Sequence, residues 1–372
     1  MRVMGIDPGT GSMDIIVLDD ESLEVLFEKA IPRVEVTRDP GIVIGLVEEA
    51  AARYRVEAIA APSGYGIAWD RRPSREVICE ATFVNKRDRE KPLQIHGLRR
   101  IMEWLAESGL PVYFTPGVVQ LPTVPEYRKA NKIDMGTADK LFTVAAALAA
   151  EERVGDPRQS NIIVVEAGYA YNAVIAVEKG RVVDGIGGTS GLPGFLGMGS
   201  MDAELAYLLA SMEPGFSRAR LFEGGAHAIA GTRSLEELAD RLASGDPKAL
   251  EAARLLEESV GKMVAAEHFI LGRVDRVYVS GRLFRVPGMG ERLRAAASRA
   301  AGAPVAEPLR LGVETKEAAT GAAILASGYA GGRYRWLVDL LGVRESRGSI
   351  FDHILLEGVA GQASKHVCGS GG

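Results

Sequence analysis

The sequence predicts an α/β fold in which one order of elements, three strands followed by helix, strand, helix, strand and helix, occurs twice. In each half, short apolar strands separated by turn residues come first, and helical patterns then alternate with single strands. The two halves also align at one fixed offset, because Asp7 pairs with Glu166 and Gly9 with Gly168, each pair being 159 residues apart. Any α/β chain can contain two runs of three strands, but an acid, a glycine and both flanking strands that match at one offset favour a duplication.

The first copy occupies the first half of the chain. We expect strands over residues 2–7, 13–18 and 24–31, a helix over 39–55, a strand over 57–61, a helix over 95–108, a strand over 111–114 and a long helix over 133–153. Asp39-Pro40 is a good helix start, since Asp caps the first turn and Pro suits the first helical position. Residues 65–92 are charged and irregular.

The second copy follows the same order. We expect strands over 161–166, 171–177 and 181–186, a glycine-rich loop over 187–200, helices over 201–211, 235–243 and 247–271, a strand over 276–279, a helix over 287–301, a strand over 304–305 and a helix over 314–327. An amphipathic helix over 334–341 and a polar, frayed end complete the chain. The expected domains are therefore residues 1–155 and 156–332, followed by a C-terminal helix and tail over 333–372.

Composition excludes several classes of protein. With 44 basic and 49 acidic residues the net charge is −5, which argues against nucleic-acid binding through a basic surface. No apolar run reaches the roughly 18 residues of a membrane helix, and the polar start is unlike a signal peptide, so we expect a cytoplasmic protein. Cys79 and Cys368 cannot by themselves form a disulfide framework or a thiolate metal site, and they fit a reducing interior, with Cys79 as a small buried residue. The five histidines lack the spacing of zinc ligands.

The strongest chemical motif follows the first strand. Asp7 ends the strand, and Gly9-Thr10-Gly11-Ser12 follows it. Glycines let backbone N–H groups approach a phosphate, the hydroxyls can donate as well, and the acid can hold a hydrated Mg²⁺ nearby. Alone, this pattern is more often a plain hairpin turn, and it is neither a P-loop nor a dinucleotide-binding motif. The equivalent acid and glycine in the second half, Glu166 and Gly168, favour phosphate binding.

With these motifs the sequence resembles the superfamily of acetate and sugar kinases, Hsp70 and actin, over roughly residues 1–330. Five segments are similar to the superfamily's motifs, in order: a first phosphate motif over 5–12, a first connecting helix from 134–140 onward, a second phosphate motif over 165–168, an adenosine motif over 277–282 and a second connecting helix over 317–323. Residues 132–140 and 187–195 are most similar to an archaeal family of unknown function thought to be butyrate-kinase-like.

The resemblance implies a fold of two duplicated RNase H-like (actin-like ATPase) domains with a nucleotide cleft between them. It also implies ATP and Mg²⁺ as cofactors and a role for each motif residue. The implied phosphate contacts are Gly9, Thr10, Gly11, Ser12 and Gly168, the implied metal ligands are Asp7 and Glu166, and the implied adenosine neighbours are Ser280, Gly281 and Arg282. Asp134 would help to position Mg²⁺ or substrate, unless it is only a helix cap.

The sequence departs from the superfamily pattern at three places. Tyr169 stands where a glycine would let a phosphate approach, and Arg282 replaces the second glycine of the adenosine motif, where it either contacts the nucleotide or blocks the pocket. The loop over 187–200 contains no Arg, Lys or His to neutralise a transferring phosphoryl group. Candidates for that cation are Arg72 and Lys86, and Arg71 and Arg75 are further candidates for contact with an anionic substrate.

Two functions fit these observations. The first is an ATP-dependent phosphotransferase that acts on a small carboxylate, as acetate and butyrate kinases do. The alternative is a nucleotide-binding regulatory or scaffold protein with little turnover, which Tyr169 and Arg282 favour. Either function predicts a nucleotide and a small anionic molecule as partners, no nucleic acid and no membrane, and allows a homodimer.

Overall fold

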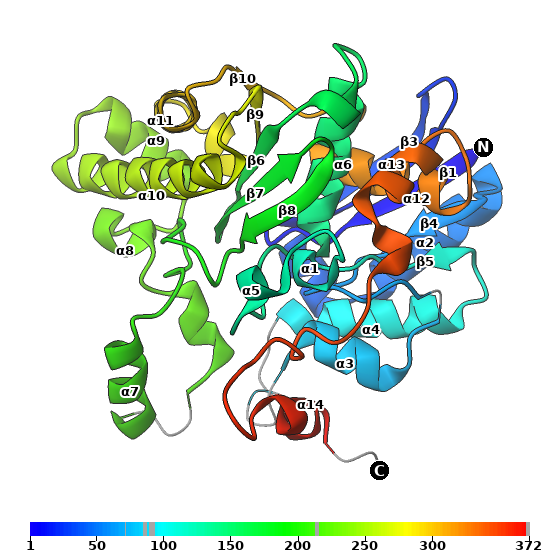
Figure 1. Cartoon of the computed structure of the whole chain (residues 1–372), viewed down its shortest axis with the longest axis horizontal. Coiled ribbons are helices and arrows are strands. Elements are labelled where there is room, and N and C mark those ends of the chain that lie inside the picture. Colours follow the sequence, from blue (N-terminus) through cyan, green and yellow to red (C-terminus); the bar gives the residue numbers. More distant parts are fainter. Residues whose placement is uncertain (71, 85–87, 89–93, 213–215, 370–372) are drawn as a thin grey trace. The chain divides into compact units, whose positions relative to one another are not determined.

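The computed structural model describes residues 1–70, 72–84, 88, 94–212 and 216–369, and its strands form two five-stranded sheets (Figure 1). The contacts divide the chain into two compact units. The first consists of Met1–Ser160, Glu178–Asp184 and Pro308–Gly372, and the second of Asn161–Val177 and Gly185–Glu307. The units differ from the expected domains, because the chain after residue 308 returns to pack on the first sheet.

In the first sheet, three strands form an antiparallel meander: β1 (Arg2–Asp7), β2 (Ser12–Asp19) and β3 (Val25–Pro32). On the other side of β1 lie two parallel strands, β4 (Ala58–Ala60) and β5 (Val112–Tyr113), so that the order is β3-β2-β1-β4-β5. The five predicted strands are confirmed, with ends that shift by no more than one residue.

The second sheet repeats this topology. Its strands are β6 (Ile162–Ala167), β7 (Asn172–Glu178), β8 (Arg181–Ile186), β9 (Arg276–Ser280) and β10 (Val305–Ala306), in the order β8-β7-β6-β9-β10. The strand register repeats as well. Asp7 lies opposite Asp14, and Glu166 lies opposite Ala173, at the same offset of 159 residues. The duplication is confirmed, and in each copy the first strand pairs in parallel with the fourth.

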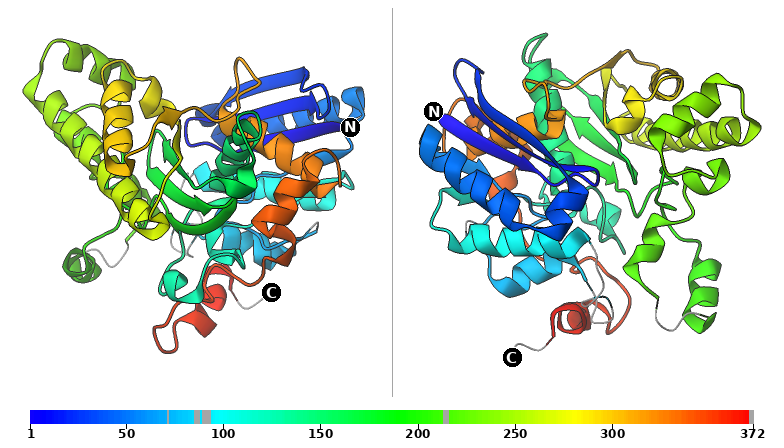
Figure 2. Two further views of the ribbon diagram at one scale, coloured as in Figure 1. Left: turned by 45° about the horizontal axis from the view of Figure 1, so that its top comes forward. Right: turned by 180° about the vertical axis from the view of Figure 1, so that it is seen from behind.

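The helices cover the sheets (Figure 2). The first unit contains α1 (Arg33–Arg38), α2 (Gly41–Tyr54), α3 (Arg75–Thr82), α4 (Gln94–Glu107), α5 (Glu126–Lys129), α6 (Ala138–Glu151), α12 (Glu317–Tyr329), α13 (Arg335–Leu341) and α14 (Ala360–Cys368). The second contains α7 (Ala203–Met212), α8 (Ala226–Ala230), α9 (Leu235–Ala243), α10 (Pro247–Leu271) and α11 (Met289–Ala301). Across the described ranges, no helix combines the length and apolar composition that crossing a bilayer requires.

The helix expected over 314–327 begins three residues later, and α1 was not predicted. Two helical predictions need a larger correction. The helix expected over 133–153 begins only at Ala138, because the chain turns sharply at Gly136, whose φ is +128°. The stretch expected to be irregular contains α3, which begins after Ser74, whose hydroxyl oxygen accepts a hydrogen bond of 3.3 Å from the Val77 N–H. Within the charged run over 86–91, all residues except Asp88 lie outside the described residues.

Glycines bring the central elements of the first unit into backbone contact. The period of two along β1 places Gly5 and Asp7 on the face that α12 covers, whereas Met4 and Ile6 face the apolar core on the other side. A Cβ atom at Gly5 would lie 2.4 Å from the Ala319 carbonyl oxygen of α12. At Gly321 of α12 it would lie 1.7 Å from a carbonyl oxygen of α6, so only glycine fits at either position.

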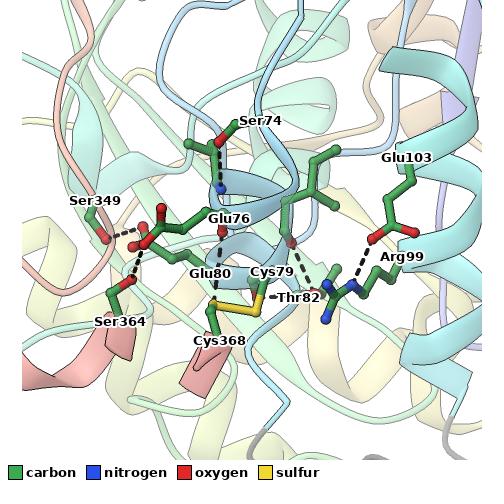
Figure 3. The surroundings of a disulfide bond; sticks show 12 residues. Ser74, Glu76, Cys79, Glu80, Thr82, Arg99, Glu103, Ser349, Ser364 and Cys368 are labelled. Carbon is green, nitrogen blue, oxygen red and sulfur yellow. Dashed lines mark hydrogen bonds and ion pairs between the residues drawn. A yellow bond between two sulfur atoms is a disulfide. The ribbon is translucent and has the colours of Figure 1, made fainter. Parts of the chain in front are cut away.

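A disulfide joins Cys79 to Cys368, and through it α3 to α14 (Figure 3). Beside it the Ser349 hydroxyl donates to Glu80 at 2.6 Å, and the Ser364 hydroxyl donates to the Glu76 carboxylate at 3.4 Å. Cys79 is buried, as expected, but the expectation of a frayed tail was wrong, because α14 is tied to α3. The two cysteines are 289 residues apart, and spacing alone does not indicate such a pair.

Replacing Cys368 by serine is expected to release α14 from α3. A nine-residue helix is too short to be stable by itself, and the disulfide is the covalent part of its anchor. Limited proteolysis should then cut residues 355–368 at least tenfold faster than in the wild type.

Cys79→Ser should have the same effect, because it removes the same bond. Ser364→Ala, which removes one exposed hydrogen bond, should leave the rate of cleavage unchanged. Equal protease resistance of Cys368→Ser and wild type would show that the disulfide does not hold the tail.

Candidate functional site

Two buried carboxylates flank the hairpin that joins β1 to β2. Asp7 is 2% exposed and Asp14 is fully buried, and the two residues pair across the strands. The turn between them carries Gly9, Thr10 and Gly11, all half-buried, and ends at the buried Ser12. The predicted phosphate-binding residues of the first motif thus lie in one short hairpin, directly beside two acids.

A lysine that sequence reasoning missed occupies this site. Lys316 immediately precedes α12, and its ammonium donates to Asp7 Oδ2 and lies 3.8 Å from Asp14 Oδ2. The Lys316 backbone N–H also donates to Asp14 Oδ2, at 2.9 Å. Asp14 Oδ1 is buried and has no hydrogen-bond partner among the described residues. No local pattern connects residue 316 with Asp7, since the contact exists only when α12 packs on β1.

Burial dominates the electrostatics of this cluster. It raises the pKa of Asp7 to about 7; the Lys316 ammonium opposes the shift, and the charges of Asp14 and Asp139 add to it. Arg33 is buried nearby, and burial lowers the pKa of its guanidinium to about 10 against the opposing charge of Asp7. The hairpin is therefore surrounded by a set of buried charges of both signs.

The acids around α6 differ from the expectation. Asp134 is buried but lies before the helix, where its Oδ1 accepts a hydrogen bond of 3.0 Å from the Gly136 N–H. Asp139, in the first turn of α6, is the acid of this region whose charge, together with that of Asp14, raises the pKa of Asp7. Burial alone would raise the pKa of Asp139. The Lys140 ammonium and hydrogen bonds outweigh burial and hold this pKa below its usual value. The structure thus places Asp139 in the electrostatic neighbourhood of the hairpin.

In the second unit, the predicted residues gather at the ends of β6 and β9. Glu166 lies opposite Ser280 in the parallel register, and it is half-buried. Gly281 has a φ of +106°, and a Cβ there would lie 2.2 Å from the Ala167 carbonyl oxygen, so this position needs glycine. At Gly168 a Cβ would lie 3.3 Å from the nearest atom, which is a mild contact.

The two substitutions in the superfamily motifs have defined surroundings. The Tyr169 hydroxyl donates to the Arg233 carbonyl at 2.8 Å, which holds the tyrosine ring near Phe195. The Arg282 side chain is exposed. The charge of Arg282 acts on Glu236. The pKa of Glu236 is lowered mainly by hydrogen bonds from the Glu236 backbone N–H and from Ser234, and the charge of Arg282 adds to this shift.

The glycine-rich loop over 187–200 packs around one aromatic ring. A Cβ at Gly188 or Gly197 would lie 2.6 or 2.1 Å from a Tyr171 side-chain atom, and a Cβ at Gly194 would lie 2.8 Å from its Cα. The Tyr171 hydroxyl in turn donates to the Leu221 carbonyl at 2.7 Å. Gly188, Gly194 and Gly197 therefore have a structural role, because they leave room for Tyr171.

Two of the basic candidates of the irregular stretch, Arg72 and Arg75, lie among the described residues, and both are exposed. Arg75 is exposed and forms an ion pair of 3.0 Å with Glu107 on α4. The Arg72 side chain is exposed as well, and its backbone N–H donates to Asp70. Arg71 and Lys86 lie outside the described residues.

The surroundings of Asp7 do not fit a metal ion bound directly to its carboxylate. Within the described part of the chain, no group of three or more His, Cys, Asp or Glu side chains is arranged to hold a metal ion. Lys316 already occupies Asp7 Oδ2, so a divalent ion bound to that oxygen would meet an ammonium group. Asp7 therefore fits a directly bound Mg²⁺ poorly, and we derive no step through a metal at this carboxylate.

Two equivalent sheets with the same strand order and register define the class of protein. The chain has the duplicated RNase H-like fold of the acetate and sugar kinase, Hsp70 and actin superfamily, as the sequence predicted. Within it, the chain belongs to the family described as "Protein of unknown function (DUF1464)", whose model matches residues 5–356.

Solved structures and one relative of known name agree with this fold. A propionate kinase from Francisella tularensis superposes with a TM-score of 0.60 at 15% identity, covering 87% of this chain and 98% of that chain. The acetate kinase of Porphyromonas gingivalis gives a TM-score of 0.56 at 14% identity, covering 87% and 99%. An acetate kinase from Symbiobacterium thermophilum is 29% identical over 166 residues, a match that spans 42% of this chain and 39% of that protein.

Proposed function

We propose that the protein is an ATP-dependent phosphotransferase that acts on a small carboxylate. The observation that carries the proposal is the ion pair between the buried Asp7 and the half-buried Lys316, which lies against the glycine-containing hairpin. A buried ion pair is often less stabilising than apolar residues of the same size, so its presence beside a hairpin suited to phosphate points to function. The acetate kinase relative supports the carboxylate as substrate class.

Phosphoryl transfer to a carboxylate needs little acid–base chemistry. The attacking oxygen is already ionised, so it forms a bond to the γ-phosphorus while the bond to the bridging oxygen breaks and its electrons leave with ADP. The protein then has to position the reactants and neutralise charge. In the first unit, Gly9, Thr10, Gly11 and Ser12 would contact phosphate, and in the second, Gly168, Ser280, Gly281 and Arg282 would contact the nucleotide.

Mg²⁺ stays a prediction, as the usual companion of ATP, with Glu166 as its expected protein ligand. The role of Asp134 near the substrate also stays a prediction, as do a cytoplasmic location and a homodimer.

The alternative is a nucleotide-binding regulatory protein with little turnover. The Tyr169 side chain favours it, since it places a bulky ring in the second phosphate motif, anchored by its hydrogen bond to Arg233. One experiment separates the two functions. Equilibrium dialysis measures ATP binding, and hydroxylamine traps any acyl phosphate formed from ATP and acetate, propionate or butyrate. Trapped product supports the kinase, binding without product supports the regulatory protein, and no binding contradicts both.

Replacing Arg282 by glycine tests the adenosine motif. If the exposed guanidinium folds over the nucleotide, the variant should bind ATP about 5- to 30-fold more weakly, which corresponds to about 1–2 kcal/mol. If the side chain blocks the pocket, the variant should bind more tightly. We expect the weaker binding, because Gly281 keeps the close turn against β6. Arg285→Gly, at an exposed position in the same segment, is the control and should bind like the wild type.

A further inference from the structure

The resemblance to acetate and sugar kinases left one catalytic part unassigned, the cation that neutralises the phosphates. We propose that Lys316 is this cation, and that its ammonium contacts the phosphates of the nucleotide at the first hairpin in place of a metal ion bound directly to Asp7. The inference rests on the proposed function, because it names the group that would receive the phosphate charge.

The position of the ammonium is the first support. The Lys316 side chain is 18% exposed, whereas the two carboxylates beneath it are 2% and 1% exposed, so the cation lies between the acids and the surface. A Cβ at Gly9 would lie 2.2 Å from Lys316 Nζ. The ammonium therefore lies directly against the backbone of the turn that the sequence assigns to phosphate. A lysine ammonium in such a place acts on phosphate as a point charge.

The second support is that the chain around Lys316 is held in place. The Glu28 carboxylate on β3 accepts hydrogen bonds from the backbone N–H groups of Val313, Glu314 and Thr315, at 2.9–3.2 Å. The Thr315 hydroxyl also donates to Glu28, at 2.9 Å. One residue later, the Lys316 N–H donates to Asp14. The segment before α12 is thus fastened to the first sheet at two points, and the lysine is positioned in advance.

The third support is energetic. An ion pair that served only stability would be a poor choice here, because burying the carboxylates of Asp7 and Asp14 costs desolvation that apolar residues of the same size would not incur. Asp14 Oδ1 is left buried without a hydrogen bond in the described chain. In this arrangement the two acids are positioning residues, and Lys316 is the group that meets the ligand.

Nucleotide binding to Lys316→Met tests the inference. Titration calorimetry would measure the affinity for ATP and for inorganic tripolyphosphate, each in Mg²⁺ and in EDTA. Lys316→Met should bind both ligands at least tenfold more weakly than the wild type under both conditions. Lys29→Met is the matched control, since Lys29 is a lysine of the same unit that is 53% exposed and lies 4.0 Å from Glu314. It should bind within twofold of the wild type.

The outcomes separate the inference from the proposed function. If the wild type binds ATP and Lys316→Met binds it equally well, with or without Mg²⁺, Lys316 does not contact phosphate, and the proposed function stands. If the wild type binds neither ligand, the proposed function fails and the inference fails with it.

Lys316→Met leaves two buried acids without their ammonium, so it can fail to fold. Two further variants keep the test decisive. Lys316→Arg retains the charge and should recover at least part of the affinity lost in Lys316→Met. Lys316→Gln keeps a hydrogen-bond donor beside the two acids but removes the charge, and should weaken tripolyphosphate binding at least tenfold. Normal binding by a folded Lys316→Gln would overturn the inference.

Discussion

Replacing Asp7 by asparagine is expected to lower the affinity for ATP at least 100-fold without lowering the melting temperature. The carboxylate holds the Lys316 ammonium against the hairpin, and misplacing a functional group by about 1 Å can cost about 100-fold. Stability should respond in the opposite direction. Burial raises the pKa of Asp7 to about 7, so the ionised side chain is unfavourable in the folded state, and a neutral amide avoids that cost.

The difference in stability should also depend on pH. Because the folded-state pKa of Asp7 is above its unfolded value of 3.8, the residue stabilises the fold below about pH 4 and loses that contribution as the pH rises to about 7. The variant lacks this titration. Its melting temperature relative to the wild type should therefore increase between pH 4 and pH 8, as measured by circular dichroism.

Glu21→Gln, an exposed change in the turn after β2, is the control and should alter neither property. Wild-type affinity for ATP in a folded Asp7→Asn protein would remove Asp7 from the site. A melting temperature that falls instead would show that the ion pair with Lys316 is mainly structural.

Replacing Gly321 by alanine is expected to destabilise the protein by about 3 kcal/mol or more. The added methyl carbon would lie 1.7 Å from the Phe142 carbonyl oxygen and 3.1 Å from the Ala146 nitrogen, which are backbone atoms of α6. Backbone cannot turn aside as a side chain can, so α6 and α12 must separate along a fully buried contact. Urea unfolding followed by tryptophan fluorescence would measure the change.

Gly45→Ala is the matched control. Gly45 lies in α2 with no atom within 4 Å of its Cβ position, so alanine there should stabilise the protein by about 0.5–1 kcal/mol. The two variants make the same chemical change in two helices, but the expected changes in the free energy of unfolding have opposite signs. Equal unfolding midpoints would contradict the close packing of α6 on α12.

The sheets could be read from the sequence because each strand is a local pattern. Strands such as those over 2–7 and 162–167 are short, apolar and bounded by turns. Because the two copies match at an offset of 159 residues, each strand in one copy also supports the equivalent strand in the other. The start of α6 was missed, since Asp134 resembles a helix cap while the turn at Gly136 delays the helix.

The candidate site divides in the same way. The hairpin after β1 was recognised from Asp7 and its glycines, and the need for glycine at position 281 is explained by its contact with Ala167. The loop over 187–200 was searched for a cation that could neutralise a phosphoryl group, whereas three of its glycines, at 188, 194 and 197, pack against Tyr171. A glycine in the sequence indicates that another group can lie close to the backbone at that position. Only the structure shows whether that group is a ligand or a side chain.

By itself, the sequence determined the duplication, the strands and the acid followed by glycines at the end of β1, since all of these are properties of neighbouring residues. Tertiary structure alone decided which cation faces Asp7 and how the two cysteines pair. Lys316 reaches Asp7 across 309 residues because α12 packs on the face of β1 that carries Gly5, and Cys368 reaches Cys79 across 289. Such pairs depend on how whole elements pack, and no local propensity or spacing carries that information.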